Sequence, residues 1–162
     1  MSEMISAMRI FTKFGLDRLR WDLREVALEL LDWKQCEEAN SVRWLLAHIS
    51  MVLNVYIPRA VTGDLGYVPE GWPDDYTDDG SHSLERLVAD IKEGEVRALE
   101  SLESLSPESL EDTLDWYIGE ERREVYLMIL ASEILHHEGQ VAAAIGLKRR
   151  MDGLSPKVEP PL

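Results

Sequence analysis

Three side chains able to bind a metal ion stand in apolar segments of this sequence. Glu133 and His137 lie four residues apart within the apolar stretch 125–145, so both project from one face of a helix. An unpaired carboxylate buried on such a face would cost several kcal/mol. His48 has a similar apolar setting in the segment WLLAHISMV, residues 44–52. The spacing therefore predicts an open metal site formed by His48, Glu133 and His137, in which the cation compensates the glutamate.

The types of these three ligands indicate the chemistry of such a site. Two histidines and one glutamate are a known ligand set for catalytic zinc, with water in the fourth position. The same donors suit nickel, iron and manganese, so ligand type does not fix the metal. His136 lies about 60° from Glu133 around a helix. We expect it to support the ligands through a hydrogen bond or to lie at the surface.

Simpler interpretations of the same residues remain open. The histidines could be hydrogen-bonded core residues, and Glu133 could pair with Arg43 or Arg122. Two familiar metal motifs are incomplete. A di-iron bundle needs two Glu-x-x-His pairs, and the chain has one, Glu133 to His136. A zinc-protease helix needs His-Glu-x-x-His, but Val141 stands at the second histidine position.

Hydrophobic periodicity predicts two long helices in the first part of the chain. The first covers residues 5–30, with a break near Gly15; its stripe is Leu16, Leu19, Leu23, Val26 and Leu30. The second begins after Asn40 as its N-cap and has Pro58 in its last turn.

Two more helices are predicted in the second part. Ser83 caps a third helix that extends to about Leu102, and the fourth runs from about Glu120 to Gly146. Residues 114–117 are an unassigned connection, and no segment shows the alternation of a strand. The chain is therefore expected to be all-α, a four-helix bundle with a long link between helices two and three.

The long link, residues 61–82, is rich in Gly, Pro and Asp. Links of this length in compact domains are usually functional or mobile. Because it also carries Tyr67, Trp72 and Tyr76, we expect a packed flap that covers a substrate.

Length and composition limit the classes of protein. The 162 residues fit one domain over 1–162, with a C-terminal tail at 147–162. The net charge of −14 argues against nucleic-acid partners and anionic membranes. Cys36 is the single cysteine, so no intrachain disulfide can form. With no leader and no membrane-spanning run expected, the predicted location is the cytoplasm.

Two segments resemble the DinB/YfiT-like superfamily of metal-dependent four-helix proteins, which is distinct from the DNA polymerase that shares the DinB name. The segment NSVRWLLAHI, residues 40–49, looks like its second-helix signature. The segment HHEGQ, residues 136–140, looks like its fourth-helix signature, commonly His-His-Arg-Gly-Gln. The order of the helices and the long second link agree with this resemblance.

The resemblance implies a divalent metal bound by three residues at one end of the bundle. The first and last ligands fall on His48 and His137. The middle ligand, usually histidine, is Glu133 in this chain, and Glu138 replaces the usual arginine. Zinc or nickel would be the first choices of metal, with manganese or iron as alternatives. A homodimer is also expected.

Several functions are compatible with these features. The resemblance favours a metal-dependent enzyme acting on a small-molecule substrate, either a thiol S-transferase or isomerase or a hydrolase. Its nucleophile would be water or a low-molecular-weight thiol such as mycothiol, bacillithiol or glutathione, activated by the metal. One alternative is a non-catalytic binding or dimerisation module with a structural His/Glu cluster. Another is an acidic stress protein that binds a small ligand in the bundle cavity without converting it.

Overall fold

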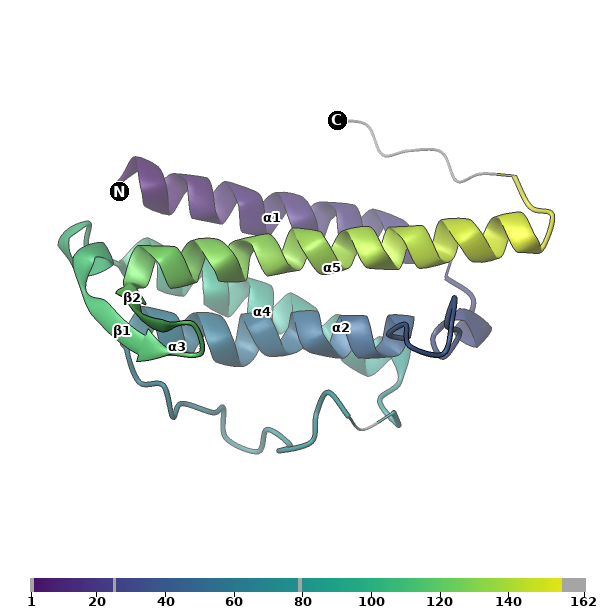
Figure 1. The fold of residues 1–162 in the computed structure, drawn as a ribbon, viewed down its shortest axis with the longest axis horizontal. Coiled ribbons are helices and arrows are strands. Elements are labelled where there is room, and N and C mark those ends of the chain that lie inside the picture. The colour runs from purple at the N-terminus through teal and green to yellow at the C-terminus, as the bar shows by residue number, and fades with distance from the viewer. Residues whose placement is uncertain (1, 25, 79, 156–162) are drawn as a thin grey trace.

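Four helical segments form the bundle in this computed structural model, which describes residues 2–155 except 25 and 79 (Figure 1). The first segment is α1 (Glu3–Leu23). The second is α2 (Val42–Met51), which continues through a π-turn (η2, Val52–Tyr56) into α3 (Ile57–Thr62). The third and fourth are α4 (Leu84–Ser104) and α5 (Arg123–Met151). Short 3-10 turns, η1 (Leu28–Leu30) and η3 (Glu108–Glu111), and a two-stranded hairpin complete the described elements. The expected all-α bundle with a long second link is confirmed.

The helices form two layers around one apolar core. In Figure 1, α1 lies beside α5, and the continuous α2–α3 helix lies beside α4. The segment Val42–Thr62 is long and apolar enough to cross a membrane, with a mean hydropathy of 1.3. However, 67% of its most apolar 18-residue window is buried in the bundle, so it serves here as a core helix.

The first helix is shorter than the sequence predicts and has no break. It ends at Leu23, and the chain then turns so that Leu30 and Leu31 are buried from a separate 3-10 turn. Gly15 does not interrupt the helix. A Cβ atom there would lie 3.1 Å from Cγ2 of Ile134, so the glycine allows α1 to approach α5 closely.

The second helix differs from the prediction at both ends. Ser41, rather than Asn40, is the N-cap, because its side chain accepts the N–H of Trp44. The helix also passes Pro58 and ends only at Thr62. In the π-turn before the proline, the Ile57 N–H donates to the carbonyl of Val52. A wider turn moves carbonyls away from the proline ring and relieves the clash that breaks a regular helix.

Two short strands occupy the connection that the sequence left unassigned. The strand β1 (Thr113–Trp116) pairs antiparallel with β2 (Gly119–Arg122), and Gly119 makes the turn with a φ of 98°. The fourth helix therefore begins at Arg123 instead of Glu120 and continues to Met151 instead of Gly146. The expected tail is thus helical at its start, and residues 156–162 lie outside the described part.

Candidate metal centre

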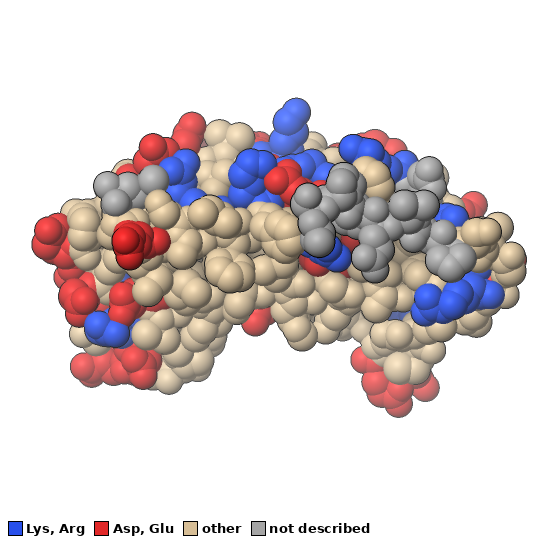
Figure 2. All heavy atoms as spheres, turned by 90° about the horizontal axis from the view of Figure 1, so that it is seen from above, with Lys and Arg blue, Asp and Glu red and all other residues tan. Residues whose placement is uncertain are grey.

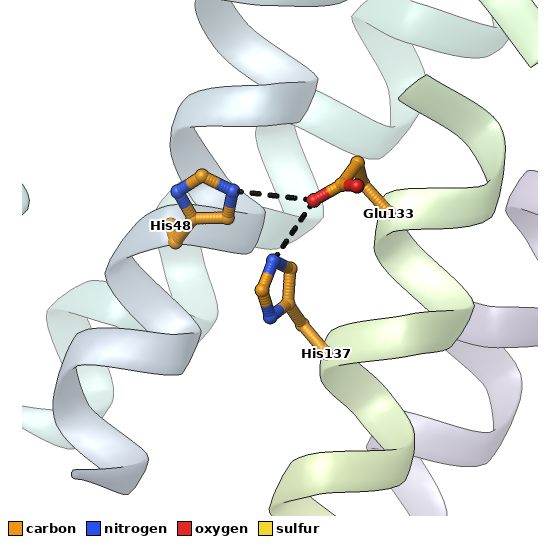
Figure 3. A group of neighbouring side chains, drawn as sticks. All are labelled: His48, Glu133 and His137. Atoms are coloured by element: carbon orange, nitrogen blue, oxygen red, sulfur yellow. Dashed lines mark hydrogen bonds and ion pairs between the residues drawn. The ribbon is translucent and has the colours of Figure 1, made fainter. Parts of the chain in front are cut away.

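His48, Glu133 and His137 converge between α2 and α5. Their side chains point toward one another (Figure 3), and one ligand atom from each lies within 4.8 Å of the others. Oε2 of Glu133 is 3.0 Å from Nε2 of His137 and 3.8 Å from Nε2 of His48. The structure therefore brings together the three residues that the sequence selected.

These distances suit a small divalent cation. In a tetrahedral site with bonds of about 2.0–2.1 Å, neighbouring ligand atoms lie about 3.3 Å apart. The two measured distances from the Glu133 oxygen fall on either side of that value. The third separation, between the ligand atoms of the two imidazoles, is no more than 4.8 Å.

The environment of Glu133 differs from the sequence expectation. Its side chain keeps 36% of its surface exposed, compared with 20% for His48 and 9% for His137. The carboxylate therefore faces an open pocket, where water can solvate it. The cost of burying its charge does not by itself require a bound cation. The alternative in which an arginine pairs with Glu133 is not found, because Arg43 pairs with Asp32, and Arg122 pairs with Glu111 and Glu124.

Gln140 fixes the orientation of His137. Its Oε1 lies 3.1 Å from Nδ1 of His137, and its Nε2 lies 3.0 Å from Nε2 of His136. An amide oxygen only accepts, so Nδ1 of His137 carries the proton and Nε2 presents a lone pair to Glu133. The two acceptor atoms, Nε2 of His137 and Oε2 of Glu133, lie 3.0 Å apart and therefore need a proton or a cation between them. Sequence analysis missed Gln140, although its i+3 spacing from His137 was visible.

The surroundings of His48 favour its neutral form. The ring of Trp44 stacks on the imidazole, with centroids 5.1 Å apart and planes 6° from parallel. Burial, and then the nearby His137, lower the pKa of His48 below its usual range. A neutral imidazole keeps the lone pair that metal binding requires.

A pocket of about 390 Å³ opens beside this cluster, and His48 and Glu133 form part of its lining. It is lined by His48, Val52, Tyr56, Arg59, Trp116, Tyr117, Ile129, Leu130 and Glu133. Most of its wall is apolar or aromatic, and the polar groups gather at the candidate ligands and at Arg59. This combination is typical of small-molecule sites.

The hairpin, and not the long link, covers the pocket. Trp116 and Tyr117 come from the hairpin, whose position is set by Tyr126 of α5. The Tyr126 hydroxyl accepts the N–H of Trp116 and donates to the carbonyl of Gly119. Sequence analysis missed these aromatic residues because a four-residue strand gives no clear periodicity.

The long link is packed, as expected, but its residues Trp72 and Tyr76 lie against another part of the bundle. Tyr76 is fully buried, and its hydroxyl donates to Asp90 of α4 at 2.7 Å. Trp72 stacks on Tyr76 with centroids 4.3 Å apart. Because Tyr67, Trp72 and Tyr76 do not line the pocket, the prediction that they form a substrate flap is wrong.

Glu138, which stands where the resemblance expects arginine, does not enter the pocket. Its side chain is 3% exposed, and the Arg18 Nε on α1 donates to both carboxylate oxygens at 3.3 Å. Burial and a hydrogen bond with Asp22 raise the pKa of Glu138. This residue therefore joins α5 to α1, away from the candidate ligands.

Fold and site together define a helical bundle with a His/Glu cluster of metal-ligand type. The chain belongs to the DinB superfamily, whose family model matches residues 13–141. No curated protein gives a significant match.

Two solved structures are similar over nearly the whole chain. One is a conserved protein from Enterococcus faecalis, with a TM-score of 0.70 and 17% identity over 94% of this chain and 99% of that one. The other is a DinB-like protein from Bacillus subtilis, with a TM-score of 0.64 and 14% identity over 99% of this chain and 100% of that one. At these identities the likeness establishes the fold.

Proposed function

We propose that the chain binds one divalent metal ion through His48, Glu133 and His137 and is a metal-dependent enzyme. The observation that carries this proposal is the convergence of two imidazoles and a carboxylate within 4.8 Å beside a pocket. Zinc or nickel would suit the nitrogen and oxygen donors best, with manganese or iron as alternatives. Bound there, the ion would lower the pKa of a thiol or of water and so supply a nucleophile.

The residues around the ligands support this use. Gln140 holds the proton of His137 on the nitrogen that faces away from Glu133. Tyr56 and Trp116 form an aromatic wall, with ring centroids 5.8 Å apart, that would exclude water from a bound substrate. The reaction class we propose is that of a thiol S-transferase or isomerase, or of a hydrolase, acting on a small substrate. We also propose that the protein acts in the cytoplasm.

Metal analysis by mass spectrometry tests the proposal. Protein purified without an affinity tag, then exposed to zinc, nickel or manganese, should hold about one ion per chain. Replacing a ligand, as in His48→Ala or His137→Ala, should remove it. The exposed His136→Ala serves as the matched control and should retain it. A stoichiometry near zero that none of the three metals restores would exclude a metal enzyme.

Glu133→His provides a second comparison. The resemblance implies three histidines in this type of site, so the variant should still bind metal, whereas Glu133→Leu should not. Loss of metal in both variants, with the fold intact, would indicate that this cluster depends on the carboxylate itself.

One observation favours a non-catalytic alternative. The direct contact of 3.0 Å between Glu133 and His137 can hold a shared proton and so satisfy both groups without metal. In that case His48→Ala would change thermal stability equally with and without a chelator. A chelator-dependent difference would favour the metal.

We also propose a homodimer. Several large apolar side chains of α1 are exposed, including Ile10 at 67%, Phe11 at 46% and Phe14 at 44%. Figure 2 shows a broad uncharged area on the side of the molecule where α1 and α5 lie. Light scattering of the purified protein should give twice the mass of one chain, and the mass of a single chain would contradict the proposal.

A further inference from the structure

Arg59 is the cation that lines the pocket beside the candidate ligands. Its Nε donates to the carbonyl of Tyr67 in the long link at 2.8 Å. Its guanidinium carbon lies 5.9 Å from the ring centroid of Tyr56. These two contacts hold the side chain at the pocket, and among the described residues no carboxylate forms an ion pair with its terminal nitrogens.

Many arginines of this acidic protein are engaged by carboxylates, which leaves Arg59 different from them. The chain has 31 acidic and 17 basic residues, and arginines such as Arg18, Arg43 and Arg97 each pair with a carboxylate. With Nε engaged by Tyr67, the two terminal nitrogens of Arg59 present parallel N–H donors. That fork matches the two oxygens of a carboxylate.

The position of Arg59 relates this fork to the candidate metal ligands. Because the helix continues through the π-turn, Arg59 lines the same pocket as His48, Val52 and Tyr56. The Tyr56 ring lies 6.4 Å from the imidazole of His48, so one aromatic ring separates the guanidinium from the ligands. A molecule in the pocket can therefore contact Arg59 at one end and the ligands at the other.

The local charge favours an anion although the whole chain repels one. The chain carries a net charge of −14, but the ionised groups lining the pocket are Arg59 and Glu133, which cancel. A divalent cation on Glu133 would make the pocket positive and would strengthen its attraction for an anion. The two ligands should then bind cooperatively, each raising the affinity of the other.

From this arrangement we infer that the pocket takes a small organic acid with an apolar, planar body. Its carboxylate binds the terminal nitrogens of Arg59, its body lies against Tyr56 and Trp116, and its other end faces the candidate ligands. The role of the end of the acid that faces the candidate ligands rests on the proposed function. The recognition of its carboxylate by Arg59 can be tested separately. The long link would then position Arg59 through the Tyr67 carbonyl.

Binding of benzoate, compared with its neutral analogue benzamide, tests the inference. Calorimetry on zinc-loaded protein should show tighter binding of benzoate. Because a hydrogen bond to a charged group contributes about 1.5–3 kcal/mol, Arg59→Gln should weaken benzoate about 10- to 100-fold and leave benzamide unchanged. Arg59→Lys, which keeps the charge but loses the fork, should bind with intermediate affinity. Arg24→Gln removes a cation that stacks on Trp21 instead and is the matched control.

Failure of this inference and failure of the metal proposal give different results. The metal content of Arg59→Gln should equal that of the wild type. If the wild type takes up no metal, a preference for benzoate that Arg59→Gln abolishes would still support recognition by Arg59. Equal binding of benzoate by wild type and Arg59→Gln, or no binding by the wild type, would overturn it. Thermal melting of each variant verifies that the fold is intact.

Discussion

The chemistry of the candidate centre depends on how protons are shared among a few side chains. Gln140 accepts from Nδ1 of His137, which leaves the other nitrogen to face Glu133. The helical period was enough to predict that Glu133 and His137 share a face. It could not predict the proton arrangement, because that follows from the contact of His137 with Gln140 and from the burial of His48.

We predict that Gln140→Leu weakens zinc binding about 10- to 100-fold without removing a ligand, the usual effect of losing a residue that orients a metal-binding histidine. The variant leaves the N–H of the nearly buried His137 without its acceptor. Competition with a chromophoric chelator measures the change. His136→Ala retains the bond between Gln140 and His137 and should have a smaller effect. Unchanged affinity in Gln140→Leu would mean that other contacts orient His137.

Element boundaries explain which pocket residues the sequence missed. The prediction placed Pro58 in the last turn of a helix, so Arg59 was left out of the site. In the structure the π-turn carries the helix past Pro58 to Thr62. The hairpin strands have four residues each and little burial, so tertiary contacts such as the Tyr126 hydroxyl determine their position. The long amphipathic helices were predicted because many residues repeat the same signal.

The π-turn also sets a limit on its neighbour, α4. A Cβ atom on Gly94 would lie 2.8 Å from Cβ of Leu53 and would collide with the Asn54 amide. Asn54 cannot easily move, because its amide donates to the carbonyls of Ser50 and Asp90. Gly94 therefore allows α4 to approach the π-turn.

Gly94→Ala should lower the free energy of unfolding by about 1–3 kcal/mol through overpacking, despite the helix preference of alanine. Gly139→Ala is the matched control, because it lies in α5 with no atom within 4 Å of the added Cβ. It should raise the free energy of unfolding by about 0.5–1 kcal/mol. Urea unfolding measures both variants. Stabilisation by Gly94→Ala would show that the two helices can move apart at little cost.

For the molecule as a whole, the acidic surface and the pocket have different electrostatic character. The net charge of −14 is expected to disfavour binding to phosphate backbones. Individual arginines instead form contacts that join neighbouring segments of the fold. Arg43 of α2 donates to both oxygens of Asp32 and to the carbonyl of His82, so it ties α2 to the segments that precede α2 and α4.

This connection predicts a pH dependence of stability. The hydrogen bond from Arg43 lowers the pKa of Asp32 below its ordinary value of 3.8. A carboxyl group with a lowered pKa in the folded state contributes stability that is present above the unfolded pKa and is lost as the pH falls through the folded pKa. Because Asp32 is largely exposed, Asp32→Asn should lower the free energy of unfolding at neutral pH by only about 0.5–1 kcal/mol. The difference from wild type should disappear in strong acid.

Arg43→Lys, which keeps the charge without the fork, should lose part of the same stability. Urea unfolding across this pH range measures the effect, and a difference that stays constant with pH would show that the ion pair does not stabilise the fold.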